Sequence, residues 1–439
     1  MSTTAPKVSS RDPLRSGLRA LAGAAASPAL DRIGGRRLME KALYRGAKGV
    51  AEAESAVRGF RRRQGGADPA RPAPGKAYAD FDLTPTQDQQ DILDAVRTFA
   101  SDILRPAAAR ADRDRRLPDD IRSAAGELGL HLIGIPEKLG GLATERSAVT
   151  AALVLEQLAY ADLSIAVALL APAAVANAIA AYGTADQQAT YLPEFVGEAP
   201  AIAALAMSEP RALADVLDPA TTATRNGDEV HVVGVKSLVP LATDARLFLV
   251  LARLDGRPQL VIVEAADPGV QVVDDPAMGL RAAATGQLHV DVSIPTDRLL
   301  GTETDALEAV RRARLAWSAA AVGTCHAVLD ETAAYVKDRV AFGEPVAHRQ
   351  SVAFTVADMA IETDALRLVV WRAAARLDRD ADAAPQIAYA RALTARHATR
   401  IGSDGVQMLG GHGFTTEFPH ERWYRDLRAA GVLDGVLSL

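Results

Sequence analysis

The order of its hydrophobic patterns constrains this chain more than any other feature. Helical patterns come first, a run of short strand patterns follows, and helical patterns then return. Residues 81–200 and those from 303 onward repeat apolar side chains at helical spacing, whereas 201–300 hold short β-branched runs between turn residues. A Rossmann unit alternates strands with helices, so this order argues against one. The sequence predicts an α+β fold that is mostly α-helical.

The first helical block begins with a start signal. Thr84 is the expected N-cap, Pro85 stands at the first helical position, and Gln87 is the matching capping-box partner. Pro106 is expected to kink or end this helix. Further helices are predicted at 117–130 and 147–160. The stretch 165–182 is nearly all apolar, which predicts a helix buried in the core.

The middle and last blocks complete the predicted architecture. Strands are expected at 230–233, 247–251, 260–263, 270–273 and 288–292. Their short length and the turn signals between them indicate a small antiparallel β-sandwich or barrel. The segments 303–340, 351–379 and 384–409 are long, Ala-rich and amphipathic, which predicts an antiparallel helical bundle. We therefore expect a basic extension with a linker (1–80), an N-terminal helical domain (81–200), a middle β domain (201–300) and a C-terminal bundle (301–439).

Composition excludes several functional classes. Cys325 is the single cysteine, so the chain has no internal disulfide and no Cys-based zinc or iron–sulfur cluster. The eight histidines show no metal-ligand spacing, and no metal site is predicted. No transmembrane segment is predicted, and the apolar stretch 165–182 is interpreted as a buried helix. We expect a cytoplasmic protein.

Charge is divided unequally along the chain. Residues 1–76 hold 16 Lys and Arg against 6 Asp and Glu, whereas 77–439 hold 33 against 49. The basic segment ends in Arg61-Arg62-Arg63 and a Pro- and Gly-rich linker. It could be a solvated extension, an arm that docks on the acidic body or on a partner subunit, or a contact for polyanions and interfaces. Nucleic-acid binding is not expected, because no aromatic residues are interleaved with the basic ones.

Two segments at predicted helix ends contain residues suited to binding phosphate groups. Arg339-Val340-Ala341-Phe342-Gly343-Glu344-Pro345 ends one helix, and Gln350 opens the next. Arg339 suits a phosphate and Phe342 suits a planar base. The second segment, Gln407–Phe414, contains Gly410 and Gly411, at which a backbone can approach a pyrophosphate closely. Each segment alone also fits an ordinary helix C-terminus.

Taken together, these segments form a more specific pattern than either segment does alone. The block order, the opening Ser208-Glu209-Pro210, Arg-x-x-Phe-Gly-x-Pro, Gln-x-x-Gly-Gly-x-Gly-Phe and the later Arg425-Asp426 resemble the acyl-CoA dehydrogenase family. The resemblance covers about residues 81–436. It implies FAD between the middle domain and the C-terminal bundle, with its nucleotide end reaching a neighbouring subunit. It also implies an acyl-CoA substrate, a carboxylate that removes the α-proton, hydride transfer to the flavin, and an electron-transfer flavoprotein as acceptor.

The resemblance divides the FAD site into two halves, and the half offered to a neighbouring subunit is complete here. The residues that it assigns to this half are Arg339, Phe342, Gln350, Gln407, Gly410 and Gly411. In the half that serves the subunit's own flavin, Ser208 is retained and Arg314 matches an arginine near the acyl group. The Gly-Ser-Asp turn that the family has after Glu209-Pro210 is Ala212-Leu213-Ala214-Asp215 here, however, and the expected Trp-Ile-Thr segment is Leu238-Val239-Pro240. Proline has neither an N–H nor a hydroxyl to offer the flavin.

The catalytic base is also altered. The family's Glu-Gly-Thr corresponds to Asp434-Gly435-Val436, and the alternative base position is Ala313. Asp434 is therefore the only candidate base, and its side chain is one methylene shorter than glutamate. Family members normally continue through another helix, whereas this sequence ends at Leu439. We expect the basic segment to replace that packing.

Three hypotheses follow. The chain is an autonomous acyl-CoA dehydrogenase with Asp434 as base, acting as a homodimer or homotetramer. Alternatively, it is a non-catalytic or half-site subunit that completes the FAD site of a related chain, as in two-chain actinobacterial members of the family. As a third hypothesis, it is a scaffold on a retired enzyme fold. Most family members are active enzymes, which favours the first hypothesis, whereas the altered residues favour the second.

Overall fold

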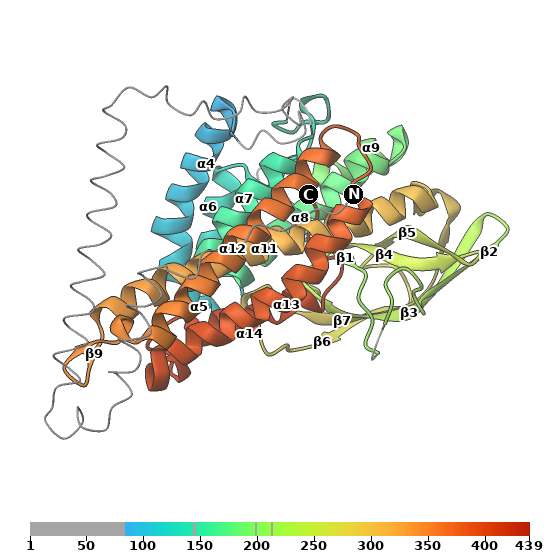
Figure 1. Ribbon diagram of the computed structural model, residues 1–439. Helices are drawn as coiled ribbons and strands as arrows, with labels where there is room; N and C mark the ends of the chain where they lie inside the picture. Colours follow the sequence, from blue (N-terminus) through green and yellow to red (C-terminus); the bar gives the residue numbers. More distant parts are fainter. Residues whose placement is uncertain (1–83, 144–145, 198–199, 212–213) are drawn as a thin grey trace, which may run out of the picture. The chain divides into compact units, whose positions relative to one another are not determined.

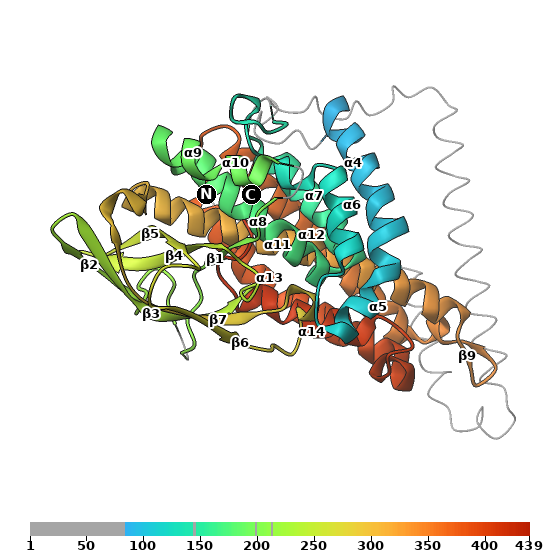
Figure 2. The same ribbon diagram turned by 180° about the vertical axis from the view of Figure 1, so that it is seen from behind.

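The computed structural model describes residues 84–439 except 144–145, 198–199 and 212–213. The expectations for the basic segment 1–80 and for the Ala212-Leu213 turn lie outside the described residues. The described part belongs to one compact unit. It has an N-terminal group of helices, a middle sheet and a C-terminal group of helices, and the predicted fold class is confirmed. Figures 1 and 2 show the sheet on one side and the helices gathered on the other.

The first helix starts two residues later than predicted. Helix α4 (Gln87–Phe99) has Thr86 as its N-cap, with a capping box to Gln89, and the prediction that placed Thr84 and Gln87 in those roles is wrong. Both pairs fit the same Thr-x-x-Gln pattern, so the pattern alone does not separate them. Pro106 does not end the helix. A π-helical turn (Ala100–Leu104) leads directly into α5 (Arg105–Asp114), with the proline in its first turn.

The remaining N-terminal helices pack around one apolar helix. They are α6 (Asp119–Glu127), α7 (Ala148–Ala161), α8 (Leu163–Tyr182), α9 (Ala185–Tyr191) and α10 (Pro193–Val196), with 3-10 turns at Leu130–Leu132 and Glu137–Leu139. In the described part of the chain, α8 alone is long and apolar enough to cross a membrane, and 83% of its apolar window is buried inside the protein. That burial is typical of a core helix, as the sequence predicted.

The middle domain is an eight-stranded sheet. Its strands are β1 (Ala203–Ala206), β2 (Thr222–Asn226), β3 (Glu229–Val239), β4 (Leu247–Leu254), β5 (Arg257–Glu264), β6 (Val270–Asp274), β7 (Gly286–Pro295) and β8 (Leu299–Leu300). Their order is β6-β7-β3-β2-β4-β5-β8, and β1 pairs with β4. Most pairs are antiparallel, but β1 and β2 both pair with β4 in parallel. The prediction of an antiparallel sheet therefore holds for most strand pairs and is wrong for these two.

The C-terminal block contains the three long helices that were predicted. They are α11 (Glu303–Asp338), α12 (Gln350–Leu377) and α13 (Ala384–Leu409), followed by α14 (His420–Leu427). A short hairpin of β9 (Val340–Ala341) and β10 (Glu344–Pro345) joins α11 to α12. This hairpin lies at the end of the helices away from the sheet (Figures 1 and 2). Trp317 and Cys325 are buried in α11, and burial raises the pKa of the Cys325 thiol.

Candidate functional site

The two segments suited to phosphate lie at the same end of the helical bundle. Tyr335, in the last turns of α11, directs its hydroxyl to the carbonyl oxygen of Leu409 at the end of α13. Its ring also meets that of Phe418 at 5.4 Å in an edge-on arrangement. These contacts connect the end of α11 with the 3-10 turn Gly410–Phe414 that follows α13. The structure therefore brings Arg339 and Gly410 to one region, although 71 residues of sequence separate them.

All six residues that the resemblance assigns to a neighbouring subunit's flavin are exposed. Phe342 sits at the tip of the β9–β10 hairpin with φ of +56° and is 97% exposed. Gly410 has φ of +59° and ψ of −131°, a conformation that side-chain-bearing residues rarely adopt. A Cβ atom at Gly410 or Gly411 would meet nothing within 4 Å. The other exposed members of this group are Arg339, Gln350 and Gln407.

Ser208 and Asp434 line a second region, a cavity of about 370 Å³. Its wall combines the segment after β1, the end of β3 and residues 431–434. Among the described residues that line it, none belongs to the exposed group of six. The two halves of the FAD site that the sequence suggested are thus separate places on this chain.

The Ser208 hydroxyl is already used within the chain. It donates a hydrogen bond to the Asp434 carbonyl oxygen (3.0 Å) and accepts one from the Asp434 N–H (3.2 Å). The nearby Leu238 adopts φ of +54°, and its N–H donates to Asp275 Oδ2 at 3.0 Å. The Ser237 hydroxyl donates to the same oxygen at 2.6 Å. These internal bonds occupy donors that would otherwise face the cavity.

The Asp434 carboxylate is paired with arginine. Arg314 Nε lies 2.8 Å from Oδ1 and Arg314 Nη2 lies 3.4 Å from Oδ2, so each oxygen has a cationic donor. Arg391, on α13, lies 3.8 Å from Oδ1 and also donates to the carbonyl oxygens of Ala430 and Leu433. Arg391 was not predicted, because nothing in the sequence around it differs from an ordinary Ala-rich helix.

The residues after Asp434 are held in a strained conformation. Gly435 and Val436 both have positive φ, of +77° and +72°, and valine rarely occupies that region. Trp317 Nε1 donates to the Gly435 carbonyl oxygen at 2.9 Å. A Cβ at Gly435 would approach the Met207 side chain to 2.7 Å. Trp317, a fully buried residue of α11, therefore helps to fix this segment.

Glu209, next to Ser208, forms a buried ion pair with Lys236. Lys236 Nζ lies 2.9 Å from Glu209 Oε1. Burial lowers the pKa of the Lys236 ammonium to about 8, against the opposing effect of Glu209. Burial acts to raise the pKa of Glu209, but the Lys236 charge and the N–H groups of Thr221 and Ala220 outweigh it and lower that pKa to about 2. This pair fixes the segment that carries Ser208 against β3.

The two regions differ in how well they suit FAD. The exposed group presents a guanidinium, two amides, an aromatic face and open glycine backbone, which fits the nucleotide and pyrophosphate end. At the cavity, the polar groups expected to face the flavin ring are bonded to the chain itself. The residues present fit one half of the cofactor and leave few donors for the other.

Comparison with known proteins places the chain in one family. Residues 86–198, 204–292 and 304–437 match the N-terminal, middle and C-terminal domains of acyl-CoA dehydrogenase. The chain is 32% identical over 363 residues to cyclohex-1-ene-1-carbonyl-CoA dehydrogenase of Geobacter metallireducens, which covers 80% of this chain and 95% of that protein. It is 30% identical over 413 residues to mouse (Mus musculus) mitochondrial short-chain specific acyl-CoA dehydrogenase, with 91% and 96% covered.

A solved structure supports the same family assignment. Butyryl-CoA dehydrogenase from Megasphaera elsdenii superposes with a TM-score of 0.73 at 28% identity, covering 80% of this chain and 95% of that one. The chain therefore belongs to the acyl-CoA dehydrogenase family, the FAD-dependent oxidoreductases that act on the CH–CH bonds of acyl-CoA thioesters.

Proposed function

We propose that this chain is a half-site subunit of a heteromeric acyl-CoA dehydrogenase. Its exposed group of six residues would hold the nucleotide end of an FAD whose ring rests on a related partner chain. The observation that carries this proposal is the contrast between the two regions. The exposed group is accessible to a ligand. By contrast, the Ser208 hydroxyl is hydrogen-bonded to the Asp434 backbone, and the Asp434 carboxylate is paired with Arg314. FAD, when bound, supplies the acceptor for the hydride of an acyl-CoA oxidation.

The state of Asp434 supports this assignment. A general base must lie within hydrogen-bond reach of the proton that it removes. Both carboxylate oxygens instead face Arg314, and Arg391 approaches from a second helix. Releasing the carboxylate would leave the half-buried Arg314 without its counter-ion, which opposes such a movement.

Exposed apolar residues near the group of six suit a partner chain. Phe354, Ile361 and Leu368 follow one another at seven-residue intervals on α12 and are 60%, 66% and 46% exposed. Such a stripe, beside the 97%-exposed Phe342, is typical of a protein–protein interface. We infer that the related chain packs against this side of the bundle.

Flavin content tests the proposal. The chain should bind little FAD alone, and it should yield a yellow, active complex when co-expressed with a family member that has an intact Glu-Gly-Thr. Arg339→Ala and Gln407→Ala should remove flavin from the complex, whereas Arg253→Ala should not, because Arg253 is a partly exposed arginine on β4, outside both regions. Stoichiometric FAD and turnover from this chain alone would refute the half-site role. An absence of flavin in every pairing would favour the scaffold hypothesis.

The autonomous enzyme is the second candidate function, because Asp434 lines the same cavity as Ser208. In this function Asp434 takes the α-proton of an acyl-CoA, Arg314 orients the carboxylate, and an electron-transfer flavoprotein accepts the electrons. Asp434→Asn should then abolish turnover while the protein keeps its flavin. Under the half-site proposal, the same substitution leaves the activity of the complex unchanged.

A further inference from the structure

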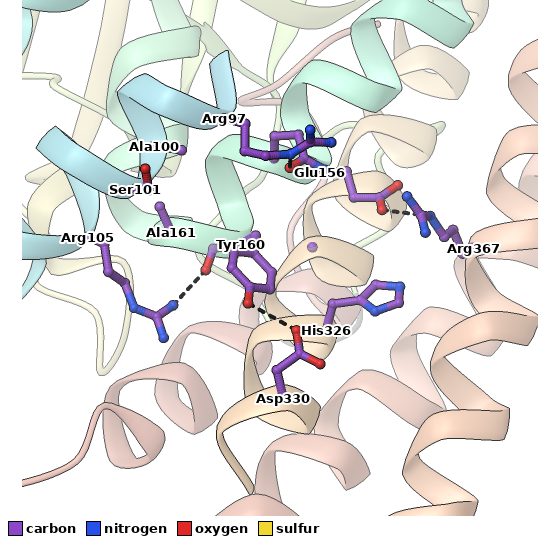
Figure 3. A pocket seen from close by; sticks show the side chains of 12 residues that line it. Arg97, Ala100, Ser101, Arg105, Glu156, Tyr160, Ala161, His326, Asp330 and Arg367 are labelled. Atoms are coloured by element: carbon purple, nitrogen blue, oxygen red, sulfur yellow. Dashed lines mark hydrogen bonds and ion pairs between the residues drawn. The ribbon is translucent and has the colours of Figure 1, made fainter. Parts of the chain in front are cut away.

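A third region is unrelated to either half of the FAD site. A cavity of about 480 Å³ lies between α4, the π-helical turn, α7, α11 and α12. Arg97, Arg105 and Arg367 line it from three different segments (Figure 3). Small residues from neighbouring helices, among them Ala100, Ala161 and Gly323, form its apolar wall. None of these residues has a role in the proposed function.

The charges of Arg97 and Arg105 are only partly compensated. Arg97 pairs with Asp94, but both side chains are more than half exposed, so this pair contributes little. Arg105 donates to the Tyr160 carbonyl oxygen at 2.9 Å and meets Glu331 only at 3.4 Å. Each guanidinium has five N–H donors, and these contacts leave several of them free for a ligand.

Two further titratable groups lie in the wall, Glu156, which is paired, and His326, which has a ring nitrogen without a partner. Glu156 is 3% exposed and lies 2.7 Å from Arg367 Nε, and burial raises the pKa of this carboxyl to about 7. His326 Nε2 is buried and has no hydrogen-bond partner among the described residues. In Figure 3 the His326 ring lies beside Asp330, whose carboxylate is engaged by the Tyr160 hydroxyl. Buried polar atoms without partners are rare in proteins and call for an explanation.

We propose that this cavity binds a small oxyanion ligand, a carboxylate or a phosphate, held by Arg97, Arg105 and Arg367. The arginines supply paired N–H donors from three directions, which suits the oxygens of such a group. His326 faces the same cavity, and the alanine and glycine wall accepts a short apolar body.

The site also predicts how binding varies with pH. Glu156 contacts Arg367 and Trp371 on α12. The other titratable or charged residues that line the cavity are Arg97 on α4, Arg105 on α5, Tyr160 on α7, and His326 and Asp330 on α11. An anion beside the Glu156 carboxylate favours its protonated form, so binding takes up a proton. Affinity should therefore rise as the pH falls toward about 7, by at most about tenfold per pH unit, and level off below that pH.

Titration of the full-length protein at constant ionic strength tests the proposal. Inorganic phosphate and succinate distinguish the two head groups, and sulfate, whose charge is constant across neutral pH, is used for the pH series. Fluorescence of Trp371, which donates to Glu156 at 3.1 Å, reports occupancy, and calorimetry confirms it. We expect saturable binding that Arg97→Gln weakens about tenfold or more, which is the effect of removing a charge-assisted contact.

Matched variants complete the test. Arg110→Gln removes an exposed, ion-paired arginine of α5 outside the cavity and should leave binding unchanged. Glu156→Gln should keep binding and abolish its pH dependence. Arg97 is largely exposed, so its variant should fold, and an equal melting temperature checks this. Absence of saturable binding by all three anions, or equal binding by the Arg97→Gln and wild-type proteins, would overturn the proposal.

Discussion

Asp426 occupies an unusual position for a carboxyl group. It is fully buried, and its Oδ1 accepts a hydrogen bond from the Leu280 N–H at 2.6 Å. The nearby Asp162 accepts from Arg422 Nε at 2.9 Å and caps the start of α8. Burial, followed by the negative charge of Asp162, raises the pKa of Asp426 well above its ordinary value. Within the Arg425-Asp426 pair of the family pattern, the aspartate therefore connects α14 to the segment before β7.

The raised pKa of Asp426 predicts that the stability of the protein depends on pH. The folded protein favours protonated Asp426, so the stabilisation is complete below the ordinary pKa of an aspartate and is lost as the pH rises through the raised value. The free energy of unfolding should fall as the pH rises from ~4 to ~8, and Asp426→Asn should flatten that fall. Urea unfolding at several pH values measures it. The exposed control Asp358→Asn should retain the full pH dependence, and an unaltered slope in Asp426→Asn would contradict the assignment.

At the level of elements, the contact of α7 with α11 requires a glycine. A Cβ at Gly323 would lie 2.0 Å from the Glu156 carbonyl oxygen and 3.0 Å from the Tyr160 nitrogen. No side chain fits between the two helix backbones, so they approach directly. The Thr324 hydroxyl donates to the Ala159 carbonyl oxygen at 2.9 Å across the same contact.

Gly323→Ala should therefore force the two helices apart. We expect a loss of about 2 kcal/mol or more in the free energy of unfolding, because the clash is with backbone atoms that cannot rotate away. Denaturant unfolding with circular dichroism measures it. Gly126→Ala on α6 is the matched control, since a Cβ there meets nothing within 4 Å. The control should be neutral or stabilise by up to about 1 kcal/mol. Equal stability of the two variants would disprove the close contact.

Periodicity in the sequence predicts which segments form helices or strands much better than it predicts where each one begins or which strands pair. The predicted strands at 247–251 and 260–263 lie inside β4 and β5, because their apolar runs are uninterrupted and bounded by turn residues. The start of α4 was misplaced because the Thr-x-x-Gln pattern occurs twice there. The parallel pairing of β1 with β4 joins segments far apart in sequence, and local pattern does not encode it.

The residues of the candidate site likewise fall into those that the sequence predicted and those that only the structure revealed. Family motifs located the exposed residues such as Arg339 and Gln407, because their glycine and proline neighbours give them a distinctive spacing. Arg391 and Asp275 have no such spacing. They reach Asp434 and Leu238 only through the packing of α13 and of the segment after β6. The cavity lined by Arg97 and Arg367 likewise combines helices that no motif connects.

The apolar stripe on α12 predicts a selective loss of assembly. Ile361 is 66% exposed, so Ile361→Lys should change the stability of the isolated chain by no more than about 0.5 kcal/mol. It should nevertheless prevent association with a second copy or with a related chain, because a buried lysine at the interface lacks a partner. Sedimentation velocity measures the assembly. The exposed control Asp186→Lys on α9 should assemble normally, and normal assembly of Ile361→Lys would exclude this stripe from the interface.

At the scale of the whole molecule, the unequal division of charge along the chain bears on how the protein assembles. Residues 77–439 hold 33 basic against 49 acidic side chains, and residues 1–76 hold 16 against 6. Opposite charges of this size attract across a subunit or between subunits, and salt weakens that attraction. We therefore predict that the basic segment docks on the acidic body of its own chain or of a partner.

Deleting residues 1–76 should weaken assembly and lower the melting temperature of the assembled protein. The difference between the full and shortened chains should shrink as salt concentration rises, because screening removes the attraction that the basic segment supplies. Replacing Arg61, Arg62 and Arg63 with glutamate should reproduce much of the effect while keeping the length of the segment, which separates charge from bulk. Light scattering and thermal melting across a salt series measure both variants. If the shortened chain keeps its assembly size and its melting temperature at low salt, the segment does not dock.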